Sequence, residues 1–101
     1  MLVYNVTIKI NTEVADNWLH WQINEHIPEV MATGLFDSFK FFRLLDQDET
    51  DGLTYIVQYL VSSMENYTRY INEFAPGFRK KITDEWGEHF VAFRSLMELV
   101  Q

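Results

Sequence analysis

Alternate residues over 2–10 (LVYNVTIKI) fall on two sides, Leu2, Tyr4, Val6, Ile8 and Ile10 on one and Val3, Asn5, Thr7 and Lys9 on the other, which predicts a β-strand with one apolar and one mixed face. Three later segments are rich in the β-branched and aromatic residues that favour strands. They cover residues 36–46, 53–61 and 90–100. In these three segments both sets of alternate positions include large apolar side chains, so both faces of the predicted sheet are expected to need cover.

Between these strands, apolar residues recur at helical spacing in two segments. The first follows Thr12, a predicted N-terminal cap, and ends at Gly34. The second begins at Ser62 and Glu65, which have the spacing of a capping box, and ends at Gly87. The expected order is therefore strand, helix, strand, strand, helix, strand.

The chain also repeats itself, in the same order and in matching elements. INEHIPEV at 23–30 returns as INEFAPGF at 71–78, late in each predicted helix. FKFFRLL at 39–45 returns as FVAFRSL at 90–96, in the second and fourth predicted strands. Two such repeats indicate a duplicated βαβ unit, with the turn DQDETDG between the two copies.

Two βαβ halves, about 1–46 and 53–101, make one ferredoxin-like domain over residues 1–101. In this α+β fold, right-handed crossovers place both helices on one face of a four-stranded antiparallel sheet. Pro28 and Pro76 lack a backbone N–H, so each is expected to kink or restart its helix. A symmetric second copy is the simplest cover for the other face, and we therefore expect a homodimeric α+β barrel.

The composition narrows the classes of partner. The net charge of −7 argues against the binding of nucleic acid, which needs a basic surface. The one basic cluster (79–81) is followed directly by acidic residues, and this mixture of charges predicts a solvated helix face. No apolar run approaches the roughly 18 residues of a membrane span, and the alternating N-terminus is unlike a signal peptide, so we expect a cytoplasmic protein without a membrane partner. There is no cysteine, and the histidines (His20, His26, His89) lack an i, i+4 pair, so we expect no metal site.

The element order, the Trp-rich first helix running into EHIP and the closing FVAFRSL resemble the dimeric α+β barrel superfamily over essentially the whole chain. Antibiotic-biosynthesis monooxygenases, EthD-like proteins, muconolactone isomerases and haem-degrading monooxygenases belong to this superfamily. More narrowly, EHIPEVMATG with EFAP and FVAFR is similar to a small bacterial family with no assigned function. The resemblance implies the architecture, while the fold itself hosts many activities.

The same resemblance implies a ligand pocket between the helices and the sheet. His26 lies on the inward stripe of the first helix, at the place that Phe74 takes in the second. It is either an acid–base group or a core histidine bonded to a carbonyl freed at Pro28, and the structural role is the commoner one. Gln22 shares the stripe, and Trp18 is either a pocket wall or core, with core favoured.

Two strand residues complete the predicted pocket. Asn5 lies on the first strand, at the position where haem-degrading members of the superfamily and some cofactor-free monooxygenases have a functional asparagine. The second helix has no histidine and no tryptophan before Trp86, so neither haem nor another cofactor is expected. Arg94 and Arg43 occupy matching places on their strands, and each either binds a ligand carboxylate or bridges acidic residues across the dimer, with the bridge favoured.

Three functions follow from these features. The first is a homodimer that binds a small apolar or aromatic ligand through Asn5, Trp18, Gln22, Phe74 and Arg94. The second is a cofactor-free monooxygenase- or isomerase-type enzyme, with His26 as the catalytic acid–base group and Asn5, Tyr4 or Arg94 orienting the substrate. The third is a structural or interaction module whose own side chains fill the pocket.

Overall fold

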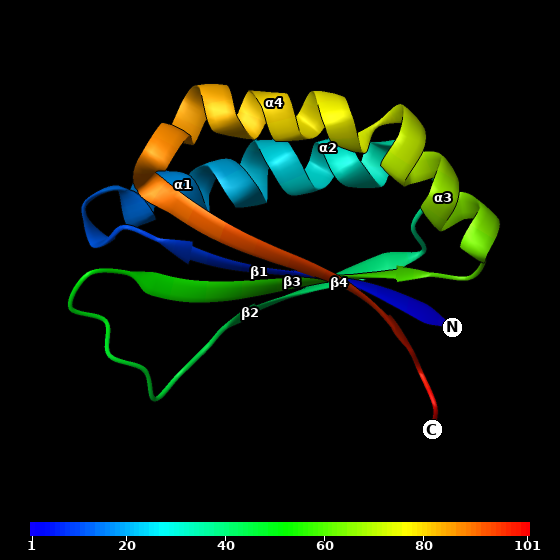
Figure 1. Cartoon of the computed structure of the whole chain (residues 1–101), viewed down its shortest axis with the longest axis horizontal. Helices are drawn as coiled ribbons and strands as arrows, with labels where there is room; N and C mark the ends of the chain where they lie inside the picture. The colour runs from blue at the N-terminus through cyan, green and yellow to red at the C-terminus, as the bar shows by residue number, and fades with distance from the viewer.

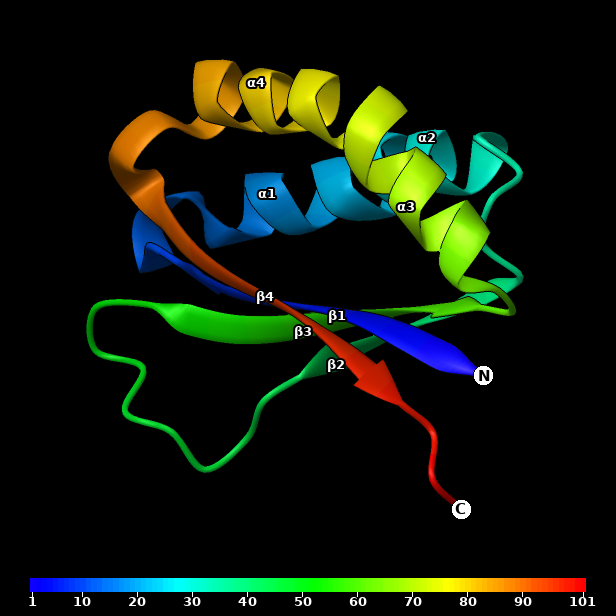
Figure 2. The same ribbon diagram turned by 45° about the vertical axis from the view of Figure 1, so that its right-hand side comes forward.

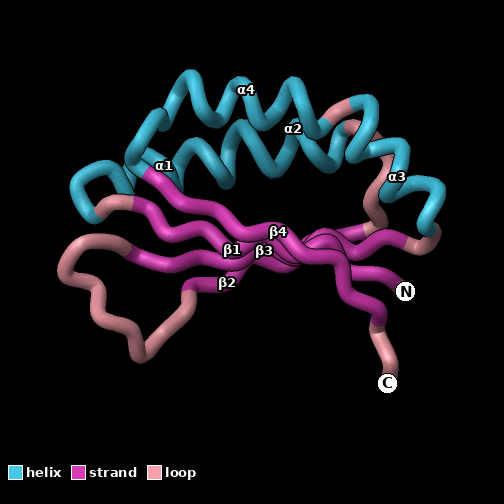
Figure 3. Tube along the Cα trace, in the orientation of Figure 1, coloured by secondary structure: helices cyan, strands magenta, loops and turns pink.

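The computed structural model describes residues 1–101 and has the predicted order of elements (Figure 1). A single antiparallel sheet has the strand order β2-β3-β1-β4. Its strands are β1 (Leu2–Ile10), β2 (Ser38–Arg43), β3 (Leu53–Val61) and β4 (Phe90–Glu98). All the helices lie on one face of this sheet, as the two layers in Figure 3 show. This is an α+β, ferredoxin-like fold.

Each predicted helix is divided in two. The first contains the 3₁₀ turn η1 (Thr12–Val14), α1 (Ala15–Trp21), the π-helical turn η2 (Gln22–His26) and α2 (Ile27–Ala32). The second contains α3 (Met64–Glu73) and α4 (Ala75–Trp86), followed by the 3₁₀ turn η3 (Gly87–His89). Figure 2 shows that α3 slopes toward the sheet, whereas α4 runs along it. No helix is both long enough and apolar enough to cross a bilayer.

Proline explains where the helices divide. Pro28 is the second residue of α2 and Pro76 is the second residue of α4. A proline at the start of a helix loses nothing, because its missing N–H would have no partner there. The equivalent residues His26 and Phe74 directly precede the two restarted helices. A new helix therefore begins beside the proline in both halves, as the duplicated phrase predicted.

Three details of the predicted boundaries were wrong. The cap of α3 is Ser63, whose hydroxyl accepts a hydrogen bond from the Asn66 N–H at 3.1 Å, and not Ser62. Asn11 rather than Thr12 precedes the first helical turn, and its side chain makes no capping bond. Strand β2 is shorter than the apolar run over 36–46, because Phe36 packs in the core before the strand starts and Leu45 is exposed after it ends.

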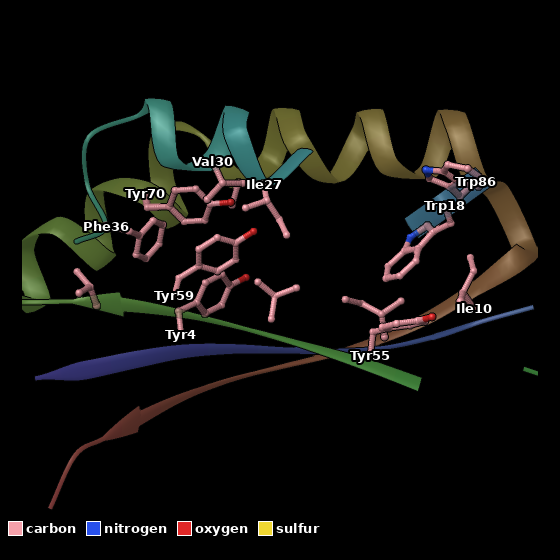
Figure 4. Close-up of a cluster of buried hydrophobic side chains, with 14 of the residues drawn as sticks. Tyr4, Ile10, Trp18, Ile27, Val30, Phe36, Tyr55, Tyr59, Tyr70 and Trp86 are labelled. Atoms are coloured by element: carbon pink, nitrogen blue, oxygen red, sulfur yellow. The ribbon is translucent and has the colours of Figure 1, made fainter. Parts of the chain in front are cut away.

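The core lies between the helices and the sheet and is rich in aromatic rings (Figure 4). Cross-strand register aligns the inward residues, so that Tyr4 on β1 lies opposite Tyr59 on β3. Trp18 from α1 packs against the Tyr55 ring at 5.2 Å and is 1% exposed. Alternation along the strands fixes which side chains face this core.

The opposite face of the sheet carries no helix and exposes apolar side chains. Phe93 and Val91 on β4 are 71% and 57% exposed, and Phe42 on β2 is 44% exposed. Residues opposite one another in the register point to the same side, so Phe93 shares this face with Thr7 and Asn5 rather than with Tyr4. We call this surface the open face.

Candidate functional site

A cavity of about 40 Å³ lies between the helices and the sheet, toward the edge formed by β4. Twelve of its sixteen lining residues are hydrophobic. The lining residues are Tyr4, Val6, Ile8, Trp18, Gln22, His26, Val57, Tyr59, Tyr70, Ala75, Phe78, Arg79, Ile82, Phe90, Ala92 and Arg94. The space is large enough for a few water molecules. Its polar groups converge from strands and helices, so this cavity is the candidate site.

His26 forms part of the wall and is held between two aromatic rings. Its imidazole stacks on Trp21, with ring centroids 4.9 Å apart, and meets Phe78 edge-on at 5.8 Å. Burial lowers the pKa of His26 from 6.5 to about 4, Arg94 and Lys81 act in the same direction, and Glu29 opposes them. The imidazole is therefore neutral at neutral pH.

Gln22 brings an unpaired polar atom to the same wall. It begins the π-helical turn that ends at His26, and its side chain is 4% exposed. Its buried Oε1 has no hydrogen-bond donor. A buried acceptor without a donor costs about 1–3 kcal/mol, and π-helical turns occur frequently at functional sites. Because Gln22 lines the cavity, a donor that reached this oxygen from the cavity would satisfy it.

Tyrosines from the sheet and from α3 supply further polar groups. Figure 4 shows Tyr4 and Tyr59 rising from the sheet with their hydroxyls directed toward the helices. Burial raises the pKa of the Tyr59 and Tyr70 hydroxyls, which therefore remain protonated. The Tyr4 hydroxyl accepts a hydrogen bond from the Arg79 guanidinium at 3.3 Å.

Five of the predicted site residues lie together on this cavity, namely Tyr4, Trp18, Gln22, His26 and Arg94. Phe74 lies next to it, where its ring stacks with those of Tyr70 and Phe78 at 6.4 Å, but it is not part of the lining.

Asn5 lies on the open face, away from the cavity. Its amide donates to the Thr7 hydroxyl at 3.2 Å and accepts from the Gln58 amide at 3.3 Å. Its neighbours Tyr4 and Val6 take the inward positions of β1. Because successive side chains of a strand point to opposite faces, the structure separates Asn5 from the predicted pocket.

The arginines differ from the expected arrangement. Arg43 is exposed and forms a salt bridge with Glu49 of its own chain at 2.7 Å. It therefore has an acidic partner that does not depend on a second subunit. Arg94 lies opposite Val6 in the register and lines the cavity, so it is on the helix-covered side of the sheet.

Arg79 was missed as a site residue, because the basic cluster around it predicted a solvated face. The signal that could have found it is the spacing after the helix restarts. Four residues of α4 have the i, i+3, i+4, i+7 spacing of one helix face, and all four line the cavity: Ala75, Phe78, Arg79 and Ile82. The chain contains no cluster of three or more His, Cys, Asp or Glu side chains that could hold a metal ion.

Several solved structures share this fold at low sequence identity. SnoaB, a cofactor-independent oxygenase from Streptomyces nogalater solved as a point mutant, matches with a TM-score of 0.72 and 14% identity over 99% of this chain and 94% of its own. An EthD family protein from Bacillus halodurans matches with a TM-score of 0.69 and 14% identity, covering 98% and 100% of the two chains. A dimeric ferredoxin-like protein from an uncultured marine organism matches with a TM-score of 0.69 and 11% identity, covering 99% and 95%. At such identities the likeness establishes the fold.

Sequence comparison places the chain in a family. No curated protein matches the sequence. A family model described as a domain of unknown function matches residues 1–100, which is nearly the whole chain. The protein therefore belongs to the family named domain of unknown function DUF4286.

Proposed function

We propose that this protein is a homodimer that binds a small apolar or aromatic molecule in the cavity between its helices and its sheet. The observation that carries the proposal is the buried Gln22 oxygen, which lacks a donor on the wall of a largely apolar cavity. Small-molecule sites commonly combine apolar walls with a few convergent polar groups. The description of SnoaB as a cofactor-independent oxygenase is compatible with a small-molecule site on this fold.

The size of the cavity sets a condition on the ligand. A benzene ring occupies an engineered cavity of about 150 Å³, which is larger than the 40 Å³ found between the helices and the sheet. A ring-sized ligand therefore needs side chains at the mouth to turn outward. Arg79 and Arg94 are both exposed, and turning Arg79 outward would break its 3.3 Å hydrogen bond to the Tyr4 hydroxyl.

A cavity-filling pair of variants tests ligand binding. Ala92 lines the cavity, whereas Ala32 lies exposed on α2. Aromatic acids and quinols would be screened by thermal shift and confirmed by ¹H–¹⁵N NMR titration. We expect Ala92→Leu to abolish binding and Ala32→Leu to retain it. If no compound binds the unaltered protein, the structural-module alternative is favoured and the proposal is refuted.

The dimer is supported by the open face. Antiparallel sheets tolerate one solvated face when that face is polar, but here Phe93, Val91 and Phe42 are exposed together with Met97, which is 39% exposed. A two-fold partner would present the same surface and cover it. Two of the similar solved structures are described as dimeric ferredoxin-like proteins.

Light scattering after size-exclusion chromatography tests the dimer. Phe93 on the open face and Ile23 on the helical layer are both exposed apolar residues, at 71% and 53%. We expect Phe93→Lys to run as a monomer, because it buries a charge in the proposed interface, and Ile23→Lys to remain dimeric. A monomeric unaltered protein at micromolar concentration would exclude the dimer.

An enzyme of the cofactor-free monooxygenase or isomerase type is the second candidate. The neutral His26 imidazole on the cavity wall favours it, because a neutral imidazole can accept a proton from a substrate held there. Given a compound that is turned over, His26→Ala should abolish turnover while the dimer persists. Unchanged turnover would remove His26 from the chemistry.

A further inference from the structure

We propose that the ligand of this cavity carries a carboxylate, which Arg79 and Arg94 bind at the mouth while its apolar or aromatic body enters the cavity. The inference rests on the proposed function and specifies the chemical class of the ligand. It depends on three observations: two arginines line the cavity, neither has an acidic partner, and they approach the cavity from different layers of the fold.

Most basic side chains of this protein are paired with acidic ones. Of the eight Lys and Arg residues, five form salt bridges, namely Lys9, Arg43, Arg69, Lys80 and Lys81. The three without an acidic partner are Lys40, Arg79 and Arg94. Two of these three line the same cavity. In a chain with 15 acidic residues, two unpaired arginines at one site are an available anion-binding pair.

The rest of the lining offers no competing anion. None of the sixteen lining residues is Asp or Glu. The protonated Tyr59 and Tyr70 hydroxyls are able to donate hydrogen bonds into the space. A ligand carboxylate would therefore meet cations and donors on several sides, without repulsion from a neighbouring carboxylate.

The two arginines approach from opposite layers. Arg94 comes from β4, the edge strand of the sheet, and Arg79 comes from α4 above it. The bond of Arg79 to the Tyr4 hydroxyl, at 3.3 Å, holds its guanidinium beside the cavity. Guanidinium groups match the planar shape of a carboxylate and bind it in a bidentate manner, so this pair favours a carboxylate over a neutral polar group.

A matched pair of one-ring probes tests the inference by NMR titration near neutral pH, with benzoate as the acid and benzamide as its neutral isostere. We expect the acid to bind about tenfold more tightly or better. Arg79→Met and Arg94→Met should each remove most of this preference and leave the affinity for the amide nearly unchanged. The control is Arg69→Met, because Arg69 is exposed on α3 and paired with Glu73; it should keep the preference.

The outcomes separate the two proposals. If acid and amide bind equally well, the carboxylate inference is overturned while the binding function stands. If neither probe binds, both are overturned. If the preference for the acid survives in the Met variants, the arginines do not cause it and the inference fails. The comparison of acid with amide in the unaltered protein needs no variant, and the NMR spectrum itself reports whether each variant is folded.

Discussion

His26 gives a prediction that follows from the position of one ring. Replacing it with Phe, the residue at the equivalent place in the second half, keeps an aromatic ring against Trp21 but removes the titratable group. Burial holds the pKa of His26 at about 4, against 6.5 for an unhindered imidazole. Because the folded pKa is the lower one, the unfolded chain takes up the proton first as the pH falls. The stability associated with neutral His26 is therefore fully present above pH 6.5 and is lost toward pH 4.

The magnitude follows from the size of the pKa shift. Each pKa unit corresponds to about 1.4 kcal/mol, so the free energy of unfolding should fall by at most about 3 kcal/mol across this window because of His26 alone. Glu29 opposes the shift, while Arg94 and Lys81 add to it. Acidic residues also titrate near pH 4, but they do so in both proteins. The difference between the unaltered protein and His26→Phe isolates the contribution of His26.

Urea denaturation at several pH values and one fixed protein concentration measures this difference. We expect the unaltered protein to lose stability relative to His26→Phe by up to about 1.4 kcal/mol per pH unit below pH 6.5. The control is His20→Asn, because His20 is exposed on α1 and should leave the pH slope unchanged. A parallel slope for His26→Phe, or an NMR titration that gives His26 a pKa above 6, would refute the reasoning.

Two further pairs of variants test backbone features by thermal unfolding. Ser63→Ala should cost about 1 kcal/mol, because it removes the cap of α3, whereas Ser62→Ala should be nearly neutral; equal effects would contradict the assigned cap. Gly87→Ala should cost about 1–3 kcal/mol, because Gly87 has a φ of +54°, whereas Gly77→Ala within α4 has open space for its methyl group and should stabilise by about 0.4–1 kcal/mol. A neutral Gly87→Ala would show that the helix end adapts.

Much of the fold could be predicted because the strands and helices have clear periods. Alternation between apolar and polar positions from Tyr4 to Ile10 indicated β1, and a turn before Leu53 with a polar pair after Val61 indicated both ends of β3. The β2 boundary could not be found in the same way, because Leu44 and Leu45 continue its apolar run although they lie in the loop, where Leu45 is 71% exposed. An exposed apolar loop looks like a strand when only the sequence is considered.

The candidate site was harder to predict, because it depends on which face of an element a residue occupies. Arg94 could not be assigned to a face, since both faces of β4 carry apolar residues; its pairing with Val6 settles the question. Arg79 was hidden by its basic neighbours, which do pair with acidic residues, Lys80 with Asp84 and Lys81 with Glu29. Only the restart of the helix at Ala75 turns Arg79 toward the cavity.

The duplication explains why His26, and not its neighbours in the repeated phrase, belongs to the site. Both prolines begin a new helix, so in both halves they have the same structural role. The residues before the breaks differ in conformation as well as in chemistry. Phe74 departs from helical geometry, with a φ of −116°, whereas His26 keeps a φ of −70° at the end of a π-helical turn. That turn places the unpaired Gln22 and His26 on one wall, so the difference between the halves creates the polar side of the cavity.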